Sequence, residues 1–359
     1  MIVHITKKLA DKLKLSPPPE GPTDALFSWR ANYVQESGVR FVVFMNDASR
    51  FTIVLNEANA AKLKKLQGLF VQTLRETLLA AGVNPEVADR YIAESGNVAY
   101  AKNSDREKTA QLNKNVVTAR WALHNFADDV DLSVYANKRT YYTSGRDEGW
   151  NPTEKMIELL GQYGLPVRKC RAYDLNARLD LDGRDAVRRL RVPADMTFER
   201  LHSLLQTAFA WHNYHLYSFG LFKEWGEKYY TEPDVELVVS EEDLEFSPDA
   251  ILMAGVKLSD YVPEYRNILY TYDYGDDWSH FIELEQIIDD CEEQLPILLS
   301  AEGDAPPEDV GGPGGFEEFL EIINDPENED YEEMSEWARM QWWRPLDFDN
   351  LAGKIKAGR

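Results

Sequence analysis

The sequence is short of features that mark several familiar classes of protein. It has only two cysteines in 359 residues, Cys170 and Cys291, which argues against a disulfide framework and indicates a reducing compartment. Its apolar runs are far too short to span a bilayer, and its first 15 residues, MIVHITKKLADKLKL, lack the continuous apolar core of a secretion signal. We therefore predict a cytoplasmic protein that does not enter a membrane.

Positive charge is also scarce, and the scarcity is local. Residues 1–165 contain 21 Lys and Arg against 19 Asp and Glu, whereas residues 166–359 contain 18 against 43. No Lys or Arg lies between Arg266 and Arg339, although 23 carboxylates do. Such a surface repels phosphate backbones and attracts cations or basic proteins. We therefore expect a basic protein partner, and no direct DNA binding by the C-terminal domain. The alternative is a solvated acidic face that only aids solubility.

The chain is long for one hydrophobic core, and its patterns predict two α+β domains. Residues 1–127 carry a hairpin pattern at 40–55 followed by helix patterns, and form a small companion domain. Residues 128–165 are polar and irregular until a capped helix begins after Asn151, so they are predicted to be a linker with a short helix. Residues 166–359 run hairpin, helix, then further strands. This order predicts a β-grasp-like mixed sheet packed on a helix, with extra helices in an acidic C-terminal region.

One turn of the second domain carries more polar groups than a turn requires. The stretch YTYDYGDDWSHFIELE, residues 270–285, predicts two strands joined by a tight turn, in which Gly275 supplies the backbone freedom. Asp276 and Asp277 lie in the turn, and His280 lies just beyond it. A hairpin needs one flexible residue but not two carboxylates beside an imidazole, so this turn is the best candidate for a functional site.

Three ordered segments resemble the plasmid pRiA4b ORF-3-like family. They are VPADMTFERLHSLLQTAFAWHNYHLYSF, YTYDYGDDWSHFIELE and PPEDVGGPGGFEEFLEIIND. Residues 1–127 resemble an uncharacterised domain that accompanies this family. Members are often labelled passenger or resolvase-like proteins of mobile elements, but the resemblance implies no established reaction, and this chain has no serine or tyrosine recombinase signature. Members commonly have a histidine where this chain has Tyr217, and often cysteines where it has Leu298 and Ala305, so a thiolate metal site is not expected.

The family motifs and the residue chemistry together define a candidate cleft. Its residues are His215, Tyr217, Tyr274, Asp276, Asp277, Trp278, His280, Glu308 and Asp309. Within it, His215, Asp276, Asp277 and His280 are candidate ligands for Mg²⁺, Mn²⁺ or Zn²⁺, with His212 as a spare donor. This grouping requires the strands that begin near residues 215 and 270 to be neighbours. The structural alternative is a histidine bonded to the sheet backbone and carboxylates that accept N–H groups of the turn.

Three functions are compatible with these patterns, and the sequence leaves open whether any reaction is catalysed. The first is a non-catalytic interaction or regulatory module that binds a basic protein through its acidic face and through exposed aromatic residues such as Trp211, Trp225 and Trp278. The second is a metal-dependent hydrolase or nuclease. The third is a nucleic-acid mimic. A phosphate site at the glycines of residues 311–315 is disfavoured, because Glu317 and Glu318 enter the first turn of the following helix.

Overall fold

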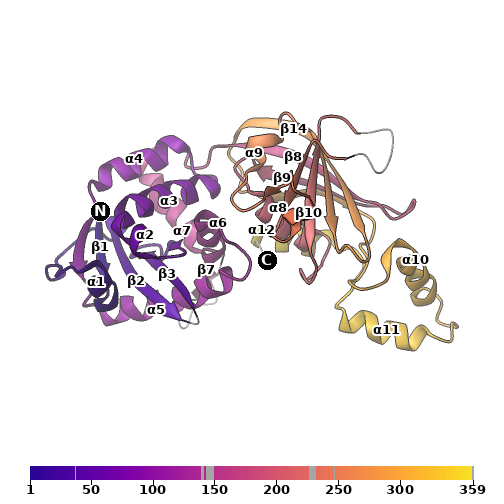
Figure 1. The fold of residues 1–359 in the computed structure, drawn as a ribbon, viewed down its shortest axis with the longest axis horizontal. Coiled ribbons are helices and arrows are strands. Elements are labelled where there is room, and N and C mark those ends of the chain that lie inside the picture. The colour runs from indigo at the N-terminus through magenta and orange to yellow at the C-terminus, as the bar shows by residue number, and fades with distance from the viewer. Residues whose placement is uncertain (37, 139–140, 143–148, 226–231, 246, 358–359) are drawn as a thin grey trace. The chain divides into compact units, whose positions relative to one another are not determined.

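The computed structural model describes residues 1–36, 38–138, 141–142, 149–225, 232–245 and 247–357 (Figure 1). The chain divides into two compact units. One comprises Met1–Cys170 with Asp290–Glu293, and the other Arg171–Asp289 with Gln294–Arg359. Each unit combines a sheet with helices, so the predicted α+β class and two-domain layout are confirmed. Among the residues described, no helix is long and apolar enough to cross a membrane.

The first unit is built on a five-stranded sheet of order β4-β3-β2-β1-β5. Strand β1 runs parallel to β2 and β5, while β2, β3 and β4 pair antiparallel. Successive residues of a strand face opposite sides, so Phe44 stacks on Phe70 in one apolar cluster while Phe41 packs in a second. Both faces of the sheet are therefore covered by helices. The strands are β1 Ile2–Ile5, β2 Ser28–Glu36, β3 Val39–Asn46, β4 Thr52–Leu55 and β5 Ala99–Lys102, with a separate pair β6 Tyr141–Tyr142 and β7 Gly149–Trp150. The helices are α1 Lys7–Leu13, α2 Ala60–Lys64, α3 Leu66–Ala80, α4 Pro85–Ser95, α5 Arg106–Ala122, α6 Asp129–Ala136 and α7 Pro152–Leu160.

Residues 128–165, which the sequence predicts to be a linker, belong to the first unit wherever the structure describes them. Helix α6 lies along the edge strand β4. Ser133 Oγ accepts a hydrogen bond from Val54 N at 2.9 Å, and Asn137 both accepts from Thr52 N and donates to Thr52 O at 2.8 Å. The polar side chains that suggested a linker therefore satisfy the backbone groups of an unpaired sheet edge. Part of the predicted boundary, residues 139–140 and 143–148, lies outside the described residues.

The second unit is built on an eight-stranded mixed sheet of order β12-β11-β10-β13-β14-β8-β9-β15. Strands β8 and β9 form the expected hairpin, and α8 follows, with Thr197 Oγ1 as its N-cap. Helix α8 packs on the sheet, where the Phe198 ring meets the Phe219 ring edge to face. The strands are β8 Cys170–Leu179, β9 Ala186–Pro193, β10 Tyr217–Phe222, β11 Val235–Val238, β12 Ile251–Leu252, β13 Asn267–Tyr272, β14 Trp278–Cys291 and β15 Ile297–Glu302. The helices up to this point are α8 Phe198–Ala208 and α9 Leu258–Tyr261.

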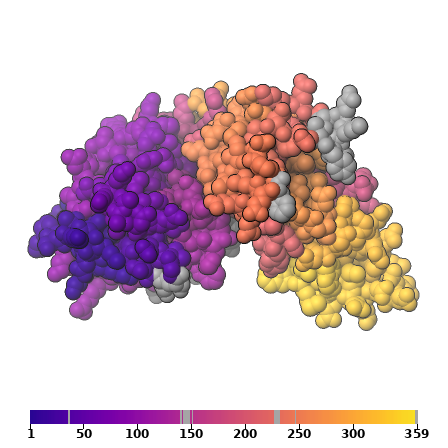
Figure 2. Space-filling model, viewed as in Figure 1, coloured from indigo at the N-terminus to yellow at the C-terminus, as the bar shows by residue number. Residues whose placement is uncertain are grey.

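Three C-terminal helices complete the second unit: α10 Gly312–Ile323, α11 Tyr331–Met340 and α12 Phe348–Ala357. Helix α12 packs on α8 and β15 through Leu351 and Ile355, which belong to the same core as the sheet. Helices α10 and α11 pack on one another through Phe319, whose ring meets Trp337 at 5.9 Å and Trp343 at 4.9 Å. Figure 2 shows the yellow C-terminal residues, which include α10 and α11, as a continuous part of the surface.

Candidate functional site

The candidate site lies where the β13–β14 turn meets the loop before α10. Strand β13 pairs with β10 on one side and β14 on the other, in a register that sets Tyr272 opposite Tyr217 and Tyr270 opposite His280. The expectation that the strands beginning near residues 215 and 270 are neighbours is therefore confirmed. This pairing carries His215, just before β10, to the end of the sheet that bears the 273–277 turn.

Three side chains from different segments converge at this point. His215 Nε2 lies 3.0 Å from Asp309 Oδ1 and 3.5 Å from Asp273 Oδ2. One ligand atom from each of the three residues lies within 4.8 Å of the others, and among the residues described this is the one group of three histidine, cysteine or acidic side chains that lie this close together. Asp273 is buried, His215 is partly exposed and Asp309 is open to solvent. We refer to these residues as the His/Asp cluster.

The backbone around the cluster is held in unusual conformations. Asp273, Asp277 and Asp309 all adopt left-handed φ angles, between 53° and 57°, a region that a non-glycine residue occupies only when its surroundings enforce it. Asp273 Oδ1 accepts a hydrogen bond from Gly275 N at 2.9 Å. Asp276 Oδ2 accepts from Gly311 N at 3.1 Å, which ties the turn to the loop before α10. Two of the turn's three carboxylates therefore accept backbone N–H groups. The alternative interpretation of the sequence assigned such bonds within the turn to Asp276 and Asp277, whereas the structure shows one for Asp273 and gives Asp276 a partner outside the turn.

Asp277 stands apart from the cluster. Its backbone N–H donates to Asp273 O at 2.7 Å, and its side chain is exposed at the tip of the turn. Partial desolvation nonetheless raises the pKa of the Asp277 carboxyl above its ordinary value.

Glu308 holds the loop before α10 in place through the hydrogen bonds of its buried side chain. The side chain is 3% exposed, and its Oε1 accepts hydrogen bonds from Tyr272 Oη at 2.5 Å and from His212 N at 3.0 Å, while Oε2 is buried with no partner in the described structure. Burial and the neighbouring Glu308 carboxylate raise the pKa of Tyr272, so the phenol stays protonated and donates. Tyr214 N in turn donates to Tyr272 Oη at 3.0 Å. This chain of bonds fixes the position of Asp309, the next residue.

The structure does not bring His280 to the cluster. Its imidazole is fully buried between Phe209 and Trp211, at ring distances of 4.6 and 5.2 Å, and Nδ1 lies 3.3 Å from the carbonyl oxygens of Tyr270 and Trp278. Burial lowers the pKa of His280 to about 3, so the ring is neutral at physiological pH. It belongs to the aromatic core, because strand alternation turns it inward.

His202 is a second buried imidazole, which the sequence patterns did not single out. It stacks on Tyr217 with ring centroids 3.5 Å apart, and its nitrogens lie 2.8 Å from Tyr270 Oη and from Asn213 Oδ1. Burial lowers its pKa to about 3. A signal was available, because His202 falls four residues after Phe198 on the apolar face of its helix. Tyr217 is thus a core residue that packs on an imidazole.

The expectation of three exposed tryptophans is wrong for two of them. Trp278 is 1% exposed and Trp211 is 6% exposed, because both rings pack in the core of the second unit. Trp225 is half-buried and donates from Nε1 to Glu283 Oε1 at 2.9 Å. Among the described residues of this unit, the exposed aromatic side chains are instead Tyr214, Tyr274, Trp342 and Phe348.

A groove begins at Asp309 and continues between α10 and α11. It has a volume of about 460 Å³ and is lined by four carboxylates and four apolar side chains. We call it the acidic groove: Asp309, Glu318, Asp330 and Glu333 at its rim, with Val310, Ile322, Met334 and Trp337 beneath. Among the described residues no Lys or Arg forms an ion pair with any of the four carboxylates. Asp309 belongs to both the acidic groove and the His/Asp cluster, so the two features are continuous.

Two known domain families together match nearly the whole chain. The family described as plasmid pRiA4b ORF-3-like protein matches residues 171–352, and a domain of unknown function, DUF6933, matches residues 2–155. The uncharacterized protein y4hQ of Sinorhizobium fredii (strain NBRC 101917 / NGR234) is 35% identical over 177 residues, which cover 47% of this chain and 79% of that protein. A crystal structure titled protein of unknown function MM3350, from Methanosarcina mazei Go1, is 30% identical and covers 52% of this chain and 97% of its own, with a TM-score of 0.43. The chain therefore belongs to the plasmid pRiA4b ORF-3-like family, with an N-terminal DUF6933 domain ahead of the family domain.

Proposed function

We propose that the second unit is a binding module that takes a basic segment of a partner protein into the acidic groove. One observation carries the proposal: four carboxylates, which have no Lys or Arg partner among the residues that the structure describes, surround an apolar floor. Residues 267–338, which include all eight lining residues of the groove, contain no Lys or Arg.

The groove suits a segment that alternates basic and apolar residues. Met334 and Trp337 are half-buried on its floor and offer apolar contact area; aromatic and Met side chains are enriched in such interfaces. Glu318 and Glu333 lie on facing helices, where they can each receive a Lys or Arg side chain. Residues 171–359 carry 16 Lys and Arg against 43 Asp and Glu, so long-range attraction accelerates the approach of a basic partner.

Calorimetric titration with a peptide of alternating lysine and leucine tests the proposal. We expect the double variant Glu318→Gln and Glu333→Gln to bind about tenfold more weakly, because each lost charge removes about 0.7 kcal/mol of complementarity. The matched control is Glu321→Gln with Glu336→Gln, which removes two exposed carboxylates from the same helices outside the groove.

Three outcomes contradict the groove as the binding site: no binding of the peptide, equal weakening in the control, or affinity that does not fall with added salt. Competition by duplex DNA for a natural basic partner would point instead to a nucleic-acid mimic, since the mimic must occupy the partner's DNA site.

A divalent cation bound by the His/Asp cluster is the second candidate function. Its supporting observation is the convergence of one imidazole and two carboxylates with ligand atoms within 4.8 Å. Mn²⁺ and Zn²⁺ accept this mixed donor set, and Mg²⁺ accepts its carboxylates. A bound cation of this kind can lower the pKa of a coordinated water, which is the chemistry a hydrolase would need.

Titration with Mg²⁺, Mn²⁺ and Zn²⁺ in turn separates this candidate from the first. Binding that is lost in Asp273→Asn and in His215→Gln, and retained in Asp277→Asn, would assign the cation to the His/Asp cluster. Loss in Asp277→Asn alone would move the cation to the tip of the turn. Absence of binding in the unmodified chain would remove the metal candidate and with it the metal-dependent hydrolase.

A further inference from the structure

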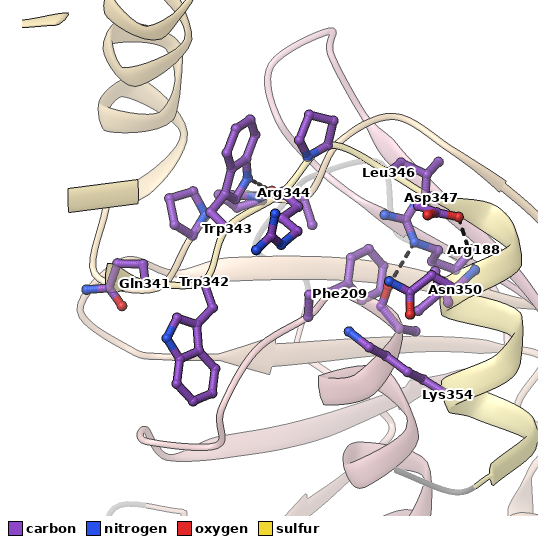
Figure 3. Close-up of a pocket in the computed structure, with 17 residues that line it drawn as sticks. Arg188, Phe209, Gln341, Trp342, Trp343, Arg344, Leu346, Asp347, Asn350 and Lys354 are labelled. Atoms are coloured by element: carbon purple, nitrogen blue, oxygen red, sulfur yellow. Dashed lines mark hydrogen bonds between the residues drawn. The ribbon is translucent and has the colours of Figure 1, made fainter. Parts of the chain in front are cut away.

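A second hollow of the second unit has the opposite charge. It lies among the end of α8, the loop at residues 305–307 and the segment that leads into α12, and it has a volume of about 530 Å³ (Figure 3). This volume falls within the range of pockets that hold small organic ligands. We call it the basic pocket, after the three cationic side chains that line it, Arg188, Arg344 and Lys354. It shares no lining residue with the acidic groove.

Arg188 is the buried cation of this pocket. The side chain is 2% exposed, and every hydrogen bond it donates goes to a neutral carbonyl oxygen. Nε donates to Ala208 O at 2.9 Å, and Nη1 donates to the carbonyl oxygens of Val187, Glu302 and Gly303 at 2.8 to 3.1 Å. Nη2 donates to no residue that the structure describes. Burial lowers the pKa of Arg188 to about 10, and the nearby Asp304 carboxylate offsets this only in part, without an ion pair in the described structure. Nη2 keeps a free donor in the wall of the pocket.

Arg344 and Lys354 leave the mouth of the pocket positive. Both are exposed, and neither forms a hydrogen bond or an ion pair within the described part of the chain. The one carboxylate that lines the pocket, Asp347, is engaged at the start of α12, where its Oδ1 accepts from Asn350 N at 3.0 Å. Nearby Asp304 accepts from Leu346 N at 2.7 Å, and its charge acts electrostatically on Arg188.

In the described structure Arg188, Arg344 and Lys354 form no ion pair with a carboxylate. This is informative because carboxylates are abundant in the second unit. They outnumber Lys and Arg by 43 to 16 in residues 171–359. Arginines elsewhere on the sheet are paired: Arg191 with Asp174 and Arg178 with Asp185. Three cations and one carboxylate line the pocket, so its lining carries a net positive charge that attracts an anion.

Aromatic side chains complete the lining. Figure 3 shows Trp342 and Trp343 on one side of the pocket and Arg188, Phe209 and Lys354 on the other. Trp343 is fixed by its Nε1, which donates to Ala305 O at 2.8 Å, whereas Trp342 is 75% exposed. Exposed indole rings and guanidinium planes both stack on planar ligand groups.

We propose that the basic pocket binds a small organic anion in which a phosphate or carboxylate group is joined to a planar ring. The anionic group would accept from Arg188 Nη2 and lie between Arg344 and Lys354, while the ring would rest against Trp342. The proposal is independent of the partner assigned to the acidic groove.

Calorimetry on the full chain, with AMP, adenosine, inorganic phosphate and benzoate as probes, tests this site. We expect AMP to bind at least about tenfold more tightly than adenosine, because only AMP brings a charged group to the cations. Tighter binding of AMP than of benzoate would identify the anionic group as a phosphate, and the reverse order a carboxylate. Lys354→Gln and Arg344→Gln should each weaken the binding of the preferred anion about fivefold.

Lys356→Gln is the matched control, since it removes an exposed lysine from the same helix outside the pocket. The proposal is overturned if neither AMP nor benzoate binds, if adenosine binds as tightly as AMP, or if the control variant loses affinity equally. A variant of the buried Arg188 is not needed for the decision, because Arg344 and Lys354 are exposed and can be replaced without disturbing the core.

Discussion

The acidic groove and the basic pocket belong to one compact unit and differ in the sign of their unpaired charge. In the part of the chain that the structure describes, the groove is lined by four carboxylates without a Lys or Arg partner, and the pocket by three cations that form no ion pair with a carboxylate. The unit as a whole is strongly acidic, so the groove follows the prevailing charge while the pocket opposes it. The comparison teaches that net charge predicts the partner of the surface at large but not the ligand of a cavity within it.

The largest expected effect is on the free energy of unfolding, and it comes from replacing the buried cation of the basic pocket. Arg188→Met should lower the free energy of unfolding by about 3–5 kcal/mol, because it leaves four backbone carbonyl groups short of the donors that Arg188 supplies. Urea denaturation measures this change. Arg184→Met, an exposed arginine in the neighbouring β8–β9 turn, should leave stability unchanged. Equal effects of the two substitutions would show that Arg188 has no structural role.

A buried histidine beside the basic pocket makes the free energy of unfolding depend on pH. His280 contacts Phe209, a lining residue of the basic pocket, and burial lowers the pKa of His280 to about 3. The unfolded chain takes up a proton near pH 6.5 and the folded chain does not, so the free energy of unfolding falls as pH drops from 6.5 towards 3. The loss for this residue is about 1.4 kcal/mol per pH unit within that window.

Urea denaturation at pH 7, 6 and 5 measures this dependence. His280→Phe should lose the part that His280 contributes and become less sensitive to acid by about 2 kcal/mol between pH 6.5 and 5. Phe209→Leu removes a ring from the same contact without removing a titrating group, so it should lower stability equally at every pH. An unchanged pH dependence in His280→Phe would contradict the buried, neutral imidazole.

A smaller effect on the free energy of unfolding is expected from the hydrogen bond between Tyr272 and Glu308, next to the acidic groove. Tyr272→Phe removes the hydroxyl that donates to Glu308 Oε1, and it leaves a 3% exposed carboxylate with one backbone donor. We expect a loss of about 2 kcal/mol in unfolding free energy. Binding of the lysine–leucine peptide should weaken as well, because Asp309 follows Glu308. Tyr214→Phe, an exposed tyrosine nearby, is the control, and similar losses in both variants would argue against the Glu308 anchor.

The smallest expected effect on stability comes from replacing a carboxylate of the acidic groove. Glu318→Gln should raise the free energy of unfolding by only about 0.3 kcal/mol, since it removes one like-charge neighbour of Glu321 on an exposed helix. Thermal denaturation at low salt detects a shift of this size. A clear loss of stability in Glu318→Gln would break the comparison, because the carboxylates of the groove would then be structural, as Arg188 is.

The sequence was most informative about local elements. Asn151 predicted the start of α7, and the pattern at residues 40–55 predicted the β3–β4 hairpin, because caps and turns depend on neighbouring residues. It was less informative about boundaries. Residues 128–165 were predicted to be a linker because the side chains that bind the edge of β4 are polar, and the strand they serve is distant in the sequence.

The candidate site was also only partly predictable from the sequence, because it depends on contacts between distant segments. His215, Asp276 and Asp309 were expected in one region, and hydrogen bonds link that region together. Asp273 was overlooked because a carboxylate at a strand end resembles an ordinary turn residue, although its position after Tyr272 turns it towards His215. His280 was placed in the same group because the sequence did not show which face of β14 is buried. Metal binding by these residues stays a prediction.

The sequence by itself determined the family, the α+β class, the division into two domains and the strongly acidic C-terminal half. These properties follow from motifs, local propensities and residue counts, which need no knowledge of distant contacts. Only the tertiary structure decided which charges remain unpaired. Arg188, Arg344 and Lys354 come from β9, the segment before α12 and α12 itself, and they surround one cavity only because α12 packs on α8 and β15. Whether a charge is paired depends on distances of a few ångströms between segments far apart in the chain, and only folding sets those distances.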